Sequence, residues 1–268
     1  MTDLENKLAS HQQFAERLRD AYVAGAVPPL RDGLATDDAE GAYAIQAINT
    51  RYWQSQGRAV IGRKVGLTSL AVQRQFGVNQ PDFGVLFDDM VVADGGRVSA
   101  STLIQPRVEA EVALVLAKDV SNPSATEEDI AEATEYAVAA LEIVDSRIQD
   151  WKISFADTVA DNGSSAGYVL GQKKLPLANL DLYSCGMVLE INGEVASVGA
   201  GAACLGHPLK AAAWLARTLA VVGEPLRAGE VILTGALGPM VSLTPGDSVV
   251  AKIGGLGEVS FTYEESSS

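Results

Sequence analysis

The chain has 268 residues, of which 47% are hydrophobic, and it carries a formal net charge of −14. This length and composition allow one large domain or two modest ones with a substantial core, and they exclude a disordered chain. The acidic balance argues against nucleic acid as a partner, because no basic patch is available to replace phosphate counterions. It would also repel an anionic substrate, so any site for an acid needs a local cation.

The cysteine content and the N-terminal region indicate the cellular compartment. Cys185 and Cys204 lack the spacing of metal ligands and are expected to be free, buried thiols in a reducing environment. The N-terminal region is polar, and no apolar run approaches the length of a membrane span. We therefore expect a cytoplasmic protein that does not contact a membrane.

The first part of the chain has the pattern of helices. Apolar residues recur at helical spacing in residues 3–24 and again in residues 36–57, which predicts two helices. Residues 60–68 form a β-like run that is interrupted by glycines and has Lys64 in its middle. Residues 70–76 are expected to form a third, short helix.

Strands are expected to dominate after this point. A turn at residues 80–84 precedes the apolar residues 85–87. We place a soft boundary here, between a helical N-terminal part (1–85) and a strand-rich part (86–268). In the second part the sequence predicts strands at 108–116, 141–145, 231–235, 248–253 and 258–263, helices at 127–140 and 208–222, and a hairpin at 186–198 with its turn at Asn192-Gly193.

Three carboxylates at strand ends are candidate metal ligands. Glu109 and Glu111 are two residues apart at the start of an apolar strand, so both side chains lie on one face. Two like charges there are costly to bury unless a cation neutralises them. Glu142 is a third carboxylate among apolar neighbours, and an all-oxygen set suits Mg²⁺ or Mn²⁺. The alternative for each is a carboxylate that faces water.

Other polar residues have two interpretations each. Lys64 is either an ordinary surface lysine or an anion contact, and Asp82 is either a turn residue or a proton-transfer group. Residues 161–165 form either a plain loop or an oxygen-rich binding loop, in which Ser164 is the candidate substrate contact. His207 is placed to begin a helix, with catalysis as the alternative. The other histidine of the chain, His11, falls on a helical stripe. A chain with only two histidines offers little basis for a multi-histidine zinc site.

These elements combine into a resemblance that spans nearly the whole chain. The motifs that carry it are, in chain order, Gly62-Arg63-Lys64-Val65-Gly66-Leu67-Thr68, Gln80-Pro81-Asp82-Phe83-Gly84, Pro106-Arg107-Val108-Glu109-Ala110-Glu111, Asp157-Thr158-Val159-Ala160-Asp161-Asn162, Leu205-Gly206-His207-Pro208-Leu209 and Leu233-Thr234-Gly235-Ala236-Leu237-Gly238-Pro239-Met240. With these motifs the chain resembles the 2-hydroxypenta-2,4-dienoate (2-keto-4-pentenoate, or vinylpyruvate) hydratases of aromatic meta-cleavage pathways, within the fumarylacetoacetate hydrolase superfamily.

The resemblance implies a fold, a cofactor and an assembly. The fold would be an α+β mixed β-roll with peripheral helices, and the subunits would form a ring as a pentamer or decamer. Association with other enzymes of the same pathway is a further implication. Mg²⁺ or Mn²⁺ would be bound by the residues that match the family's acidic motif, which are Glu109, Glu111 and Glu142.

The resemblance also implies a reaction and the residues that carry it. A dienol acid would ketonise and then add water at C4, giving 4-hydroxy-2-oxopentanoate. Lys64 and Asp82 match the family's residues near the pocket and form the expected proton-transfer pair. Thr234 and Gly235 match the turn that holds the α-keto-acid end of the substrate, and Lys64 is a further candidate for that contact.

Three rival functions remain open from the sequence. A 4-oxalocrotonate decarboxylase would share the metal site and the lysine. An acylpyruvate hydrolase would need a histidine in the first eighty residues, where His11 is the only candidate. A non-catalytic partner subunit is a third reading, against which the intact acidic triad argues.

Overall fold

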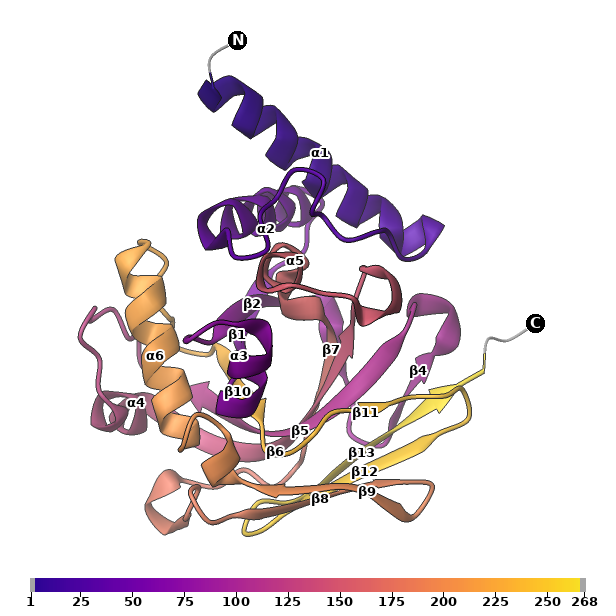
Figure 1. The fold of residues 1–268 in the computed structure, drawn as a ribbon. Helices are drawn as coiled ribbons and strands as arrows, with labels where there is room; N and C mark the ends of the chain where they lie inside the picture. The colour runs from indigo at the N-terminus through magenta and orange to yellow at the C-terminus, as the bar shows by residue number, and fades with distance from the viewer. Residues whose placement is uncertain (1–2, 266–268) are drawn as a thin grey trace.

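The computed structural model describes residues 3–265, which fold into peripheral helices around two mixed β-sheets (Figure 1). Two long N-terminal helices lie at the top of Figure 1, and α6 lies along one side. The helices in residues 3–265 are α1 (Asp3–Ala24), α2 (Ala39–Ser55), α3 (Leu70–Phe76), α4 (Glu127–Ala133), α5 (Phe155–Ala160) and α6 (Pro208–Val221).

The larger sheet has eight strands in the order β2-β1-β10-β5-β6-β7-β3, with β11 paired to β5. It is mixed, because β1 and β10 are parallel whereas β10, β5, β6 and β7 follow one another antiparallel. Its strands are β1 (Val60–Gly66), β2 (Asp82–Phe87), β3 (Val91–Val92), β5 (Pro106–Leu116), β6 (Thr134–Asp145), β7 (Ser165–Leu170), β10 (Val231–Ala236) and β11 (Val241–Ser242).

The smaller sheet has five strands in the order β4-β13-β12-β8-β9, with β8 and β9 at the bottom of Figure 1. Its strands are β4 (Gly96–Ser99), β8 (Gly186–Ile191), β9 (Glu194–Ala200), β12 (Ser248–Ile253) and β13 (Gly257–Glu264).

The main core fills the space between the two sheets. The even-numbered residues of β5, such as Val112 and Leu114, pack in one cluster with Leu189 of β8 and Phe261 of β13. The inner side of α6 joins the same cluster through Leu215. Because strand side chains alternate, the odd-numbered residues of β5 point away from this core, into the concave side of the larger sheet.

Most of the elements predicted from the sequence are confirmed. The helices expected at 3–24, 36–57, 70–76 and 208–222 are α1, α2, α3 and α6. The predicted hairpin is β8–β9, and its turn residues Asn192 and Gly193 have φ values of 55° and 83°, which is the left-handed pair that a tight hairpin turn requires. The expected mixed β-roll with peripheral helices is also confirmed.

The helix predicted for residues 127–140 is wrong in its second half. The capping box of Thr126 and Asp129 begins α4 as predicted, but the helix ends at Ala133 and the chain continues directly as β6. The alanines of this segment suit a helix locally, but here they lie between β5 and β7 and complete both hydrogen-bonded ladders. Similarly, the turn expected at 80–84 is shorter than predicted, because β2 already begins at Asp82.

Strand β1 ends before the expected boundary at residue 85, and strand β2 crosses it. The two strands pair with each other inside the larger sheet. The division into residues 1–85 and 86–268 stays a prediction. Among the described residues, no helix is long and apolar enough to cross a membrane.

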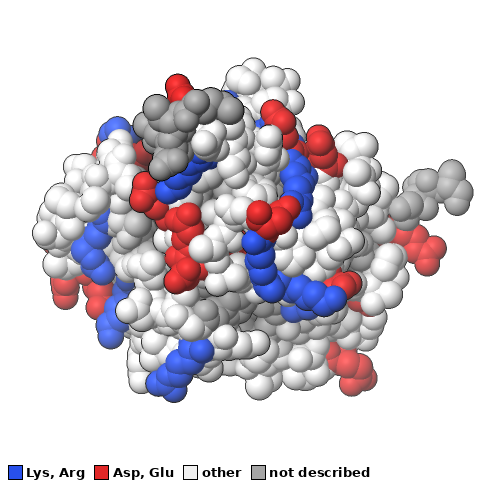
Figure 2. Space-filling model, turned by 45° about the horizontal axis from the view of Figure 1, so that its top comes forward, with Lys and Arg blue, Asp and Glu red and all other residues white. Residues whose placement is uncertain are grey.

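On the face shown in Figure 2, acidic and basic side chains are interspersed. Exposed or half-exposed ion pairs of the described residues include Arg58 with Asp89 at 2.6 Å and Lys252 with Glu190 at 2.7 Å. Surface pairs of this kind contribute little to the free energy of unfolding.

Candidate metal centre and active site

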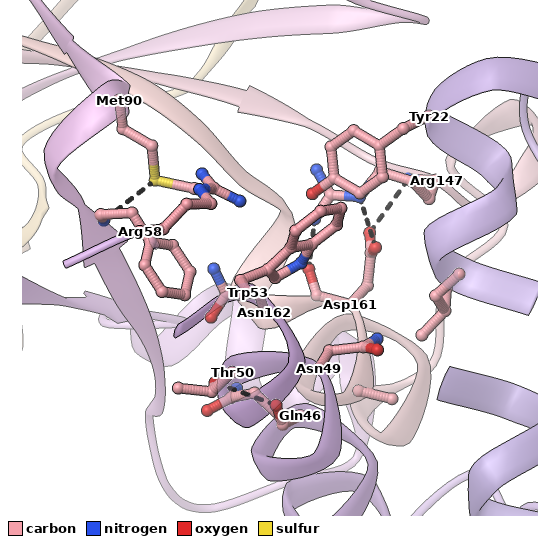
Figure 3. Close-up of a pocket in the computed structure, with 13 residues that line it drawn as sticks. Tyr22, Gln46, Asn49, Thr50, Trp53, Arg58, Met90, Arg147, Asp161 and Asn162 are labelled. Carbon is pink, nitrogen blue, oxygen red and sulfur yellow. Dashed lines mark hydrogen bonds and ion pairs between the residues drawn. The ribbon is translucent and has the colours of Figure 1, made fainter. Parts of the chain in front are cut away.

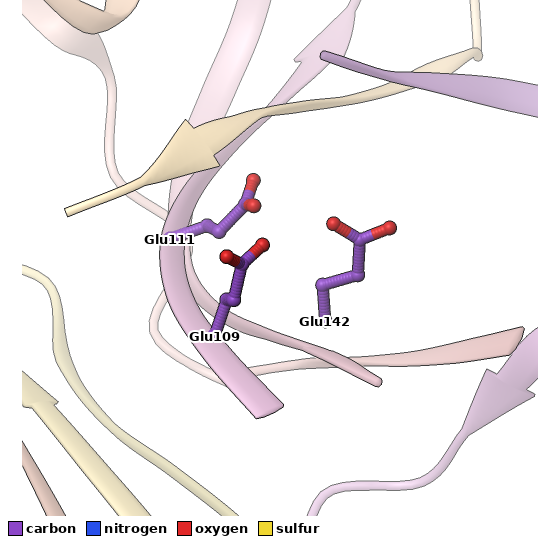
Figure 4. Close-up of side chains that lie close together, drawn as sticks. All are labelled: Glu109, Glu111 and Glu142. Carbon is purple, nitrogen blue, oxygen red and sulfur yellow. The ribbon is translucent and has the colours of Figure 1, made fainter. Parts of the chain in front are cut away.

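Three glutamates meet on the concave side of the larger sheet (Figure 4). Glu109 and Glu111 share the odd-numbered face of β5, as their spacing predicted, and Glu142 of β6 is paired directly opposite Glu109. One carboxylate oxygen from each of the three lies within 4.8 Å of the others. Glu111 and Glu142 are fully buried, whereas Glu109 is half-buried. Strand pairing therefore gathers three like charges at one point.

These carboxylates have oxygens that the protein does not satisfy. Oε1 of Glu111 and both oxygens of Glu142 are buried without a hydrogen-bond partner. The exception is Oε2 of Glu111, which accepts a hydrogen bond of 2.7 Å from the Gly235 N–H. Burial raises the pKa of all three carboxyls, and that of Glu109 rises to about 7. Unpartnered, convergent carboxylate oxygens are the donor set that a hard divalent cation requires, so the residues fit such an ion.

Lys64 provides the positive charge closest to this cluster. Its Nζ lies 3.3 Å from Oε2 of Glu142, although the angle does not make a directed hydrogen bond. Burial lowers the pKa of this amine, but the charges of Glu142, then Asp82, Glu109 and Glu111, outweigh burial and hold the pKa above its ordinary value. Lys64 is therefore an ammonium at neutral pH.

Glycines make room for the Lys64 side chain. A β-carbon on Gly163 would lie 3.1 Å from Cδ and 3.2 Å from Cε of Lys64. One on Gly84 would lie 3.1 Å from its Cγ and would overlap the Asn162 backbone. Gly163 stands between Asn162 and Ser164, and all three residues have φ near +60°. Such backbone is costly for non-glycine residues, and it often marks functional sites.

Asp82 lies on the same side of the sheet as Lys64. The residue is buried at the start of β2, in register with Gly66 of β1, and its Oδ1 has no hydrogen-bond partner. Burial raises the pKa of the carboxyl, and the Lys64 charge opposes this. The structure thus brings the two residues predicted to transfer protons next to the glutamate cluster.

The residues predicted to bind the substrate are already engaged with protein groups. The Ser164 hydroxyl donates to Oδ2 of Asp161 at 3.1 Å, and the Thr234 hydroxyl donates to the Val112 carbonyl at 2.8 Å. The Gly235 N–H is the donor to Glu111 described above. Their assignment as substrate contacts stays a prediction. In this structure their hydrogen bonds hold the strands and the loop that carry the site residues.

The sequence did not single out Ser165, whose side chain acts on Glu142, whereas the Ser164 hydroxyl is bonded to Asp161. The Ser165 hydroxyl is buried, has no hydrogen-bond partner, and lowers the pKa of Glu142. The distinction depends on the left-handed turn at residues 162–164, which decides which serine faces the cluster and carries no recognisable local pattern. Cys204 was expected to be a buried free thiol and is one; its Sγ donates to the Thr234 carbonyl at 2.9 Å.

The two histidines lie in structural positions. His207 begins α6, and its Nδ1 accepts a hydrogen bond of 3.0 Å from the Leu209 N–H. His11 is buried on α1, where the charges that act on it belong to Lys7, Asp38 and Glu40 rather than to the glutamate cluster. Neither histidine supplies the His-Glu pair that an acylpyruvate hydrolase would need.

A second group of buried charges lies in a pocket beneath α1 and α2 (Figure 3). Arg147 donates from Nε to Oδ1 of Asp161 at 2.6 Å and from Nη1 to the carbonyls of Asp145 and Ser165. The Tyr22 ring covers the guanidinium at 5.1 Å. Since both charged groups are satisfied by protein partners, this cluster supports the loop that carries Gly163 and has a structural role.

Comparison with known proteins agrees with the geometry. The family model described as fumarylacetoacetate (FAA) hydrolase C-terminal matches residues 60–263, which include all of the residues of the cluster. The chain belongs to the fumarylacetoacetate hydrolase family. This membership confirms the superfamily expected from the motifs.

Two relatives and one solved structure are similar to this chain over nearly its whole length. 2-Keto-4-pentenoate hydratase 1 of Dechloromonas aromatica is 54% identical over 96% of this chain and 98% of its own. 2-Keto-4-pentenoate hydratase of Burkholderia vietnamiensis is 53% identical over 97% and 99%. 4-Oxalocrotonate decarboxylase from Pseudomonas putida G7, solved with magnesium and adipate, is 36% identical, has a TM-score of 0.90 and covers 98% of this chain and 99% of its own.

Proposed function

We propose that this protein adds water to 2-hydroxypenta-2,4-dienoate (2-oxopent-4-enoate) and releases 4-hydroxy-2-oxopentanoate, in the catabolism of aromatic compounds. The observation that carries the proposal is the buried glutamate cluster, with unpartnered oxygens, beside an ammonium and a second carboxylate. The near full-length similarity to 2-keto-4-pentenoate hydratases supports the choice of this substrate.

Glu109, Glu111 and Glu142 would hold a divalent ion, Mg²⁺ or Mn²⁺. When bound, such an ion supplies Lewis acidity that stabilises negative charge on the oxygen at C2 of the substrate. The Gly235 N–H fixes Glu111 in place, and Lys64 compensates the charge of Glu142. The ligands are therefore oriented before the ion arrives.

Lys64 and Asp82 are proposed to move the protons. Ketonisation removes the proton of the 2-hydroxyl and adds one at C5, which gives 2-oxopent-3-enoate. Water then attacks C4, loses a proton, and C3 gains one. Lys64 is an ammonium and suits the donor role, whereas the unpartnered Oδ1 of Asp82 suits the acceptor role.

The proposal is tested by following the loss of ultraviolet absorbance of the dienoate, with and without a chelator. We expect turnover that the chelator abolishes and that added Mg²⁺ or Mn²⁺ restores. Replacement of Asp82 by Asn should lower kcat and leave binding of Mg²⁺ unchanged. Turnover that persists in the chelated protein would contradict the proposed role of the glutamates.

Decarboxylation of 4-oxalocrotonate is the second candidate. The observation in its favour is the similarity to the decarboxylase structure, at 36% identity and a TM-score of 0.90. Assays in which each substrate is supplied alone distinguish the two activities. Carbon dioxide release from the oxalocrotonate, without consumption of the dienoate, would replace the hydratase proposal.

Three finer features are proposed with the function. The subunits are proposed to form a homo-oligomeric ring, a pentamer or a decamer, which light scattering of the purified protein would measure. A cytoplasmic location and association with other enzymes of the pathway are proposed on the same resemblance. Cell fractionation and co-purification test these two.

A further inference from the structure

The inference concerns the substrate's carboxylate and rests on the proposed function. Besides a metal ion, the groups expected to bind it are Lys64, Thr234 and Gly235, and each already contacts another protein group in this structure. Lys64 pairs with Glu142, the Thr234 hydroxyl donates to Val112, and the Gly235 N–H donates to Glu111. The negative charges of the three glutamates and Asp82 outnumber the positive charges of a divalent ion and Lys64 by one. An incoming anion therefore needs a further cation.

Arg107 is the next cation on the same face of β5. It is two residues before Glu109, and strand geometry turns residues 107, 109 and 111 to the same side. The side chain is half-buried, and its charge acts on the Glu109 carboxyl. Arg107 thus lies at the exposed end of the row of side chains whose buried end is Glu111.

The Arg107 guanidinium is held by uncharged groups. Its Cζ lies 4.3 Å from the centre of the Trp151 ring, and Nη1 lies 3.5 Å from Sδ of Met240. Among residues 3–265, no carboxylate lies within ion-pair distance of it, in contrast to the paired Arg147 or Lys64. Stacking against an aromatic face and a sulfur leaves the edge of the guanidinium free to donate hydrogen bonds.

The Trp151 ring is fixed by an unusual backbone. Asp150 and Trp151 are consecutive non-glycine residues with φ values of 57° and 55°. The indole N–H donates to the Gln105 carbonyl at 2.9 Å, and Gln105 in turn donates from its side chain to the Ser146 carbonyl at 2.7 Å. Left-handed backbone at two such residues is costly and persists where the surrounding contacts impose it. Here those contacts place a flat surface beneath Arg107.

We propose that Arg107, oriented by Trp151, binds the carboxylate of the 2-oxo acid at the mouth of the glutamate cluster. The planar guanidinium matches the two oxygens of a carboxylate and supplies the missing positive charge. Arg107 is then a substrate-binding residue, and Trp151 is a positioning residue.

The test is a calorimetric titration in the presence of Mg²⁺ with 2-oxopentanoate, which has no double bond to hydrate, and with its neutral analogue 2-oxopentanamide. For Arg107→Met we expect the affinity for the acid to fall about 10- to 100-fold, as for the loss of a charge-assisted hydrogen bond, while the affinity for the amide changes little. Trp151→Leu should weaken binding of the acid less. The affinity for Mg²⁺ should not fall in either variant.

Arg97→Gln is the matched control, because Arg97 is exposed and pairs with Glu264 away from the cluster. This variant should bind both compounds as the wild type does. Wild-type affinity of Arg107→Met for the acid, equal losses for acid and amide, or no binding of the acid by the wild type would each overturn the inference. If the wild type binds the acid through Arg107 but does not hydrate the dienoate, the proposed function fails and the inference stands.

Discussion

A β-carbon on Gly66 would overlap Oδ1 of Asp82, and it would lie 3.3 Å from Nζ of Lys64. Gly66 and Asp82 are paired in register, so neither strand can shift to relieve the overlap. The absence of a side chain at this position is what allows the proposed proton acceptor and donor to share one space.

We expect Gly66→Ala to lower kcat/KM at least about 100-fold, since small displacements of catalytic groups have effects of this size. Its affinity for Mg²⁺ should remain close to that of the wild type, because the glutamates belong to other strands. Gly186→Ala is the control: Gly186 is also a terminal residue of a strand, at the start of β8, and nothing lies within 4 Å of the added carbon. Equal activity in the two variants would show that the space at Gly66 is not required.

Replacement of Glu111 by Gln should stabilise the metal-free protein and remove its stabilisation by Mg²⁺. In the metal-free protein the change removes the carboxylate of Glu111 from a cluster of three, and the amide oxygen can still accept from Gly235. We expect a Tm about 2–4 °C higher, equivalent to about 1 kcal/mol. The increase in Tm that Mg²⁺ gives the wild type should be lost. A lower Tm of the metal-free variant would mean that the carboxylates do not repel one another.

The affinity for Mg²⁺ should fall as the pH falls through about 7. The pKa of Glu109 is raised by burial to about 7 in the metal-free protein, so below this pH a proton occupies the carboxyl and competes with the ion. With one proton displaced, the loss is about tenfold per pH unit below the pKa. Calorimetric titrations between about pH 8 and about pH 6 measure this, and a constant affinity over that range would contradict it.

His207 should make the stability of the protein sensitive to acid. Its Nδ1 can accept the Leu209 N–H only while the imidazole is neutral, and burial lowers its pKa below 6.5. A lowered folded-state pKa gives a contribution that is present above about pH 6.5 and is lost as the pH falls. The loss should be about 1 kcal/mol, the value of a helix cap.

The comparison for this prediction is His207→Asn, because asparagine caps a helix without titrating in this range. Chemical denaturation of both proteins at about pH 7.5 and about pH 5.5 gives the difference. If the free energy of unfolding falls equally in the wild type and in His207→Asn between these pH values, the helix cap does not depend on the charge of His207.

The sequence predicted the elements whose patterns are local. The spacing of Glu109 and Glu111 in an apolar strand was sufficient to place them on one face, and the turn at Asn192-Gly193 identified its hairpin. Glu142, a candidate from its apolar neighbours and from the resemblance, is paired with Glu109 in the structure. Each of these inferences depends on residues that are close in sequence or belong to a recognised motif.

The features that the sequence did not predict depend on contacts between distant segments. The alanines of β6 have no strand pattern of their own and are fixed by β5 and β7. The orientation of Ser165 follows from the left-handed turn before it, and the position of Trp151 follows from its bond to Gln105. The positive φ values of Trp151 and Ser164 have no compositional signal, so these side chains could be placed only with the structure.

The pairing of β5 with β6 also determines how an ion could enter or leave. Glu111 and Glu142 are carried by β5 and β6, a central antiparallel pair of the larger sheet that is hydrogen-bonded over nearly all of its length. Amide hydrogens of such a central pair exchange with solvent through openings that approach global unfolding, whereas frayed ends and loops exchange by local opening. Exchange of a bound ion therefore cannot use local unfolding of the backbone that carries its ligands. It must proceed through rearrangement of side chains at the rim, where Glu109 is half-buried, while the backbone amides beneath remain protected.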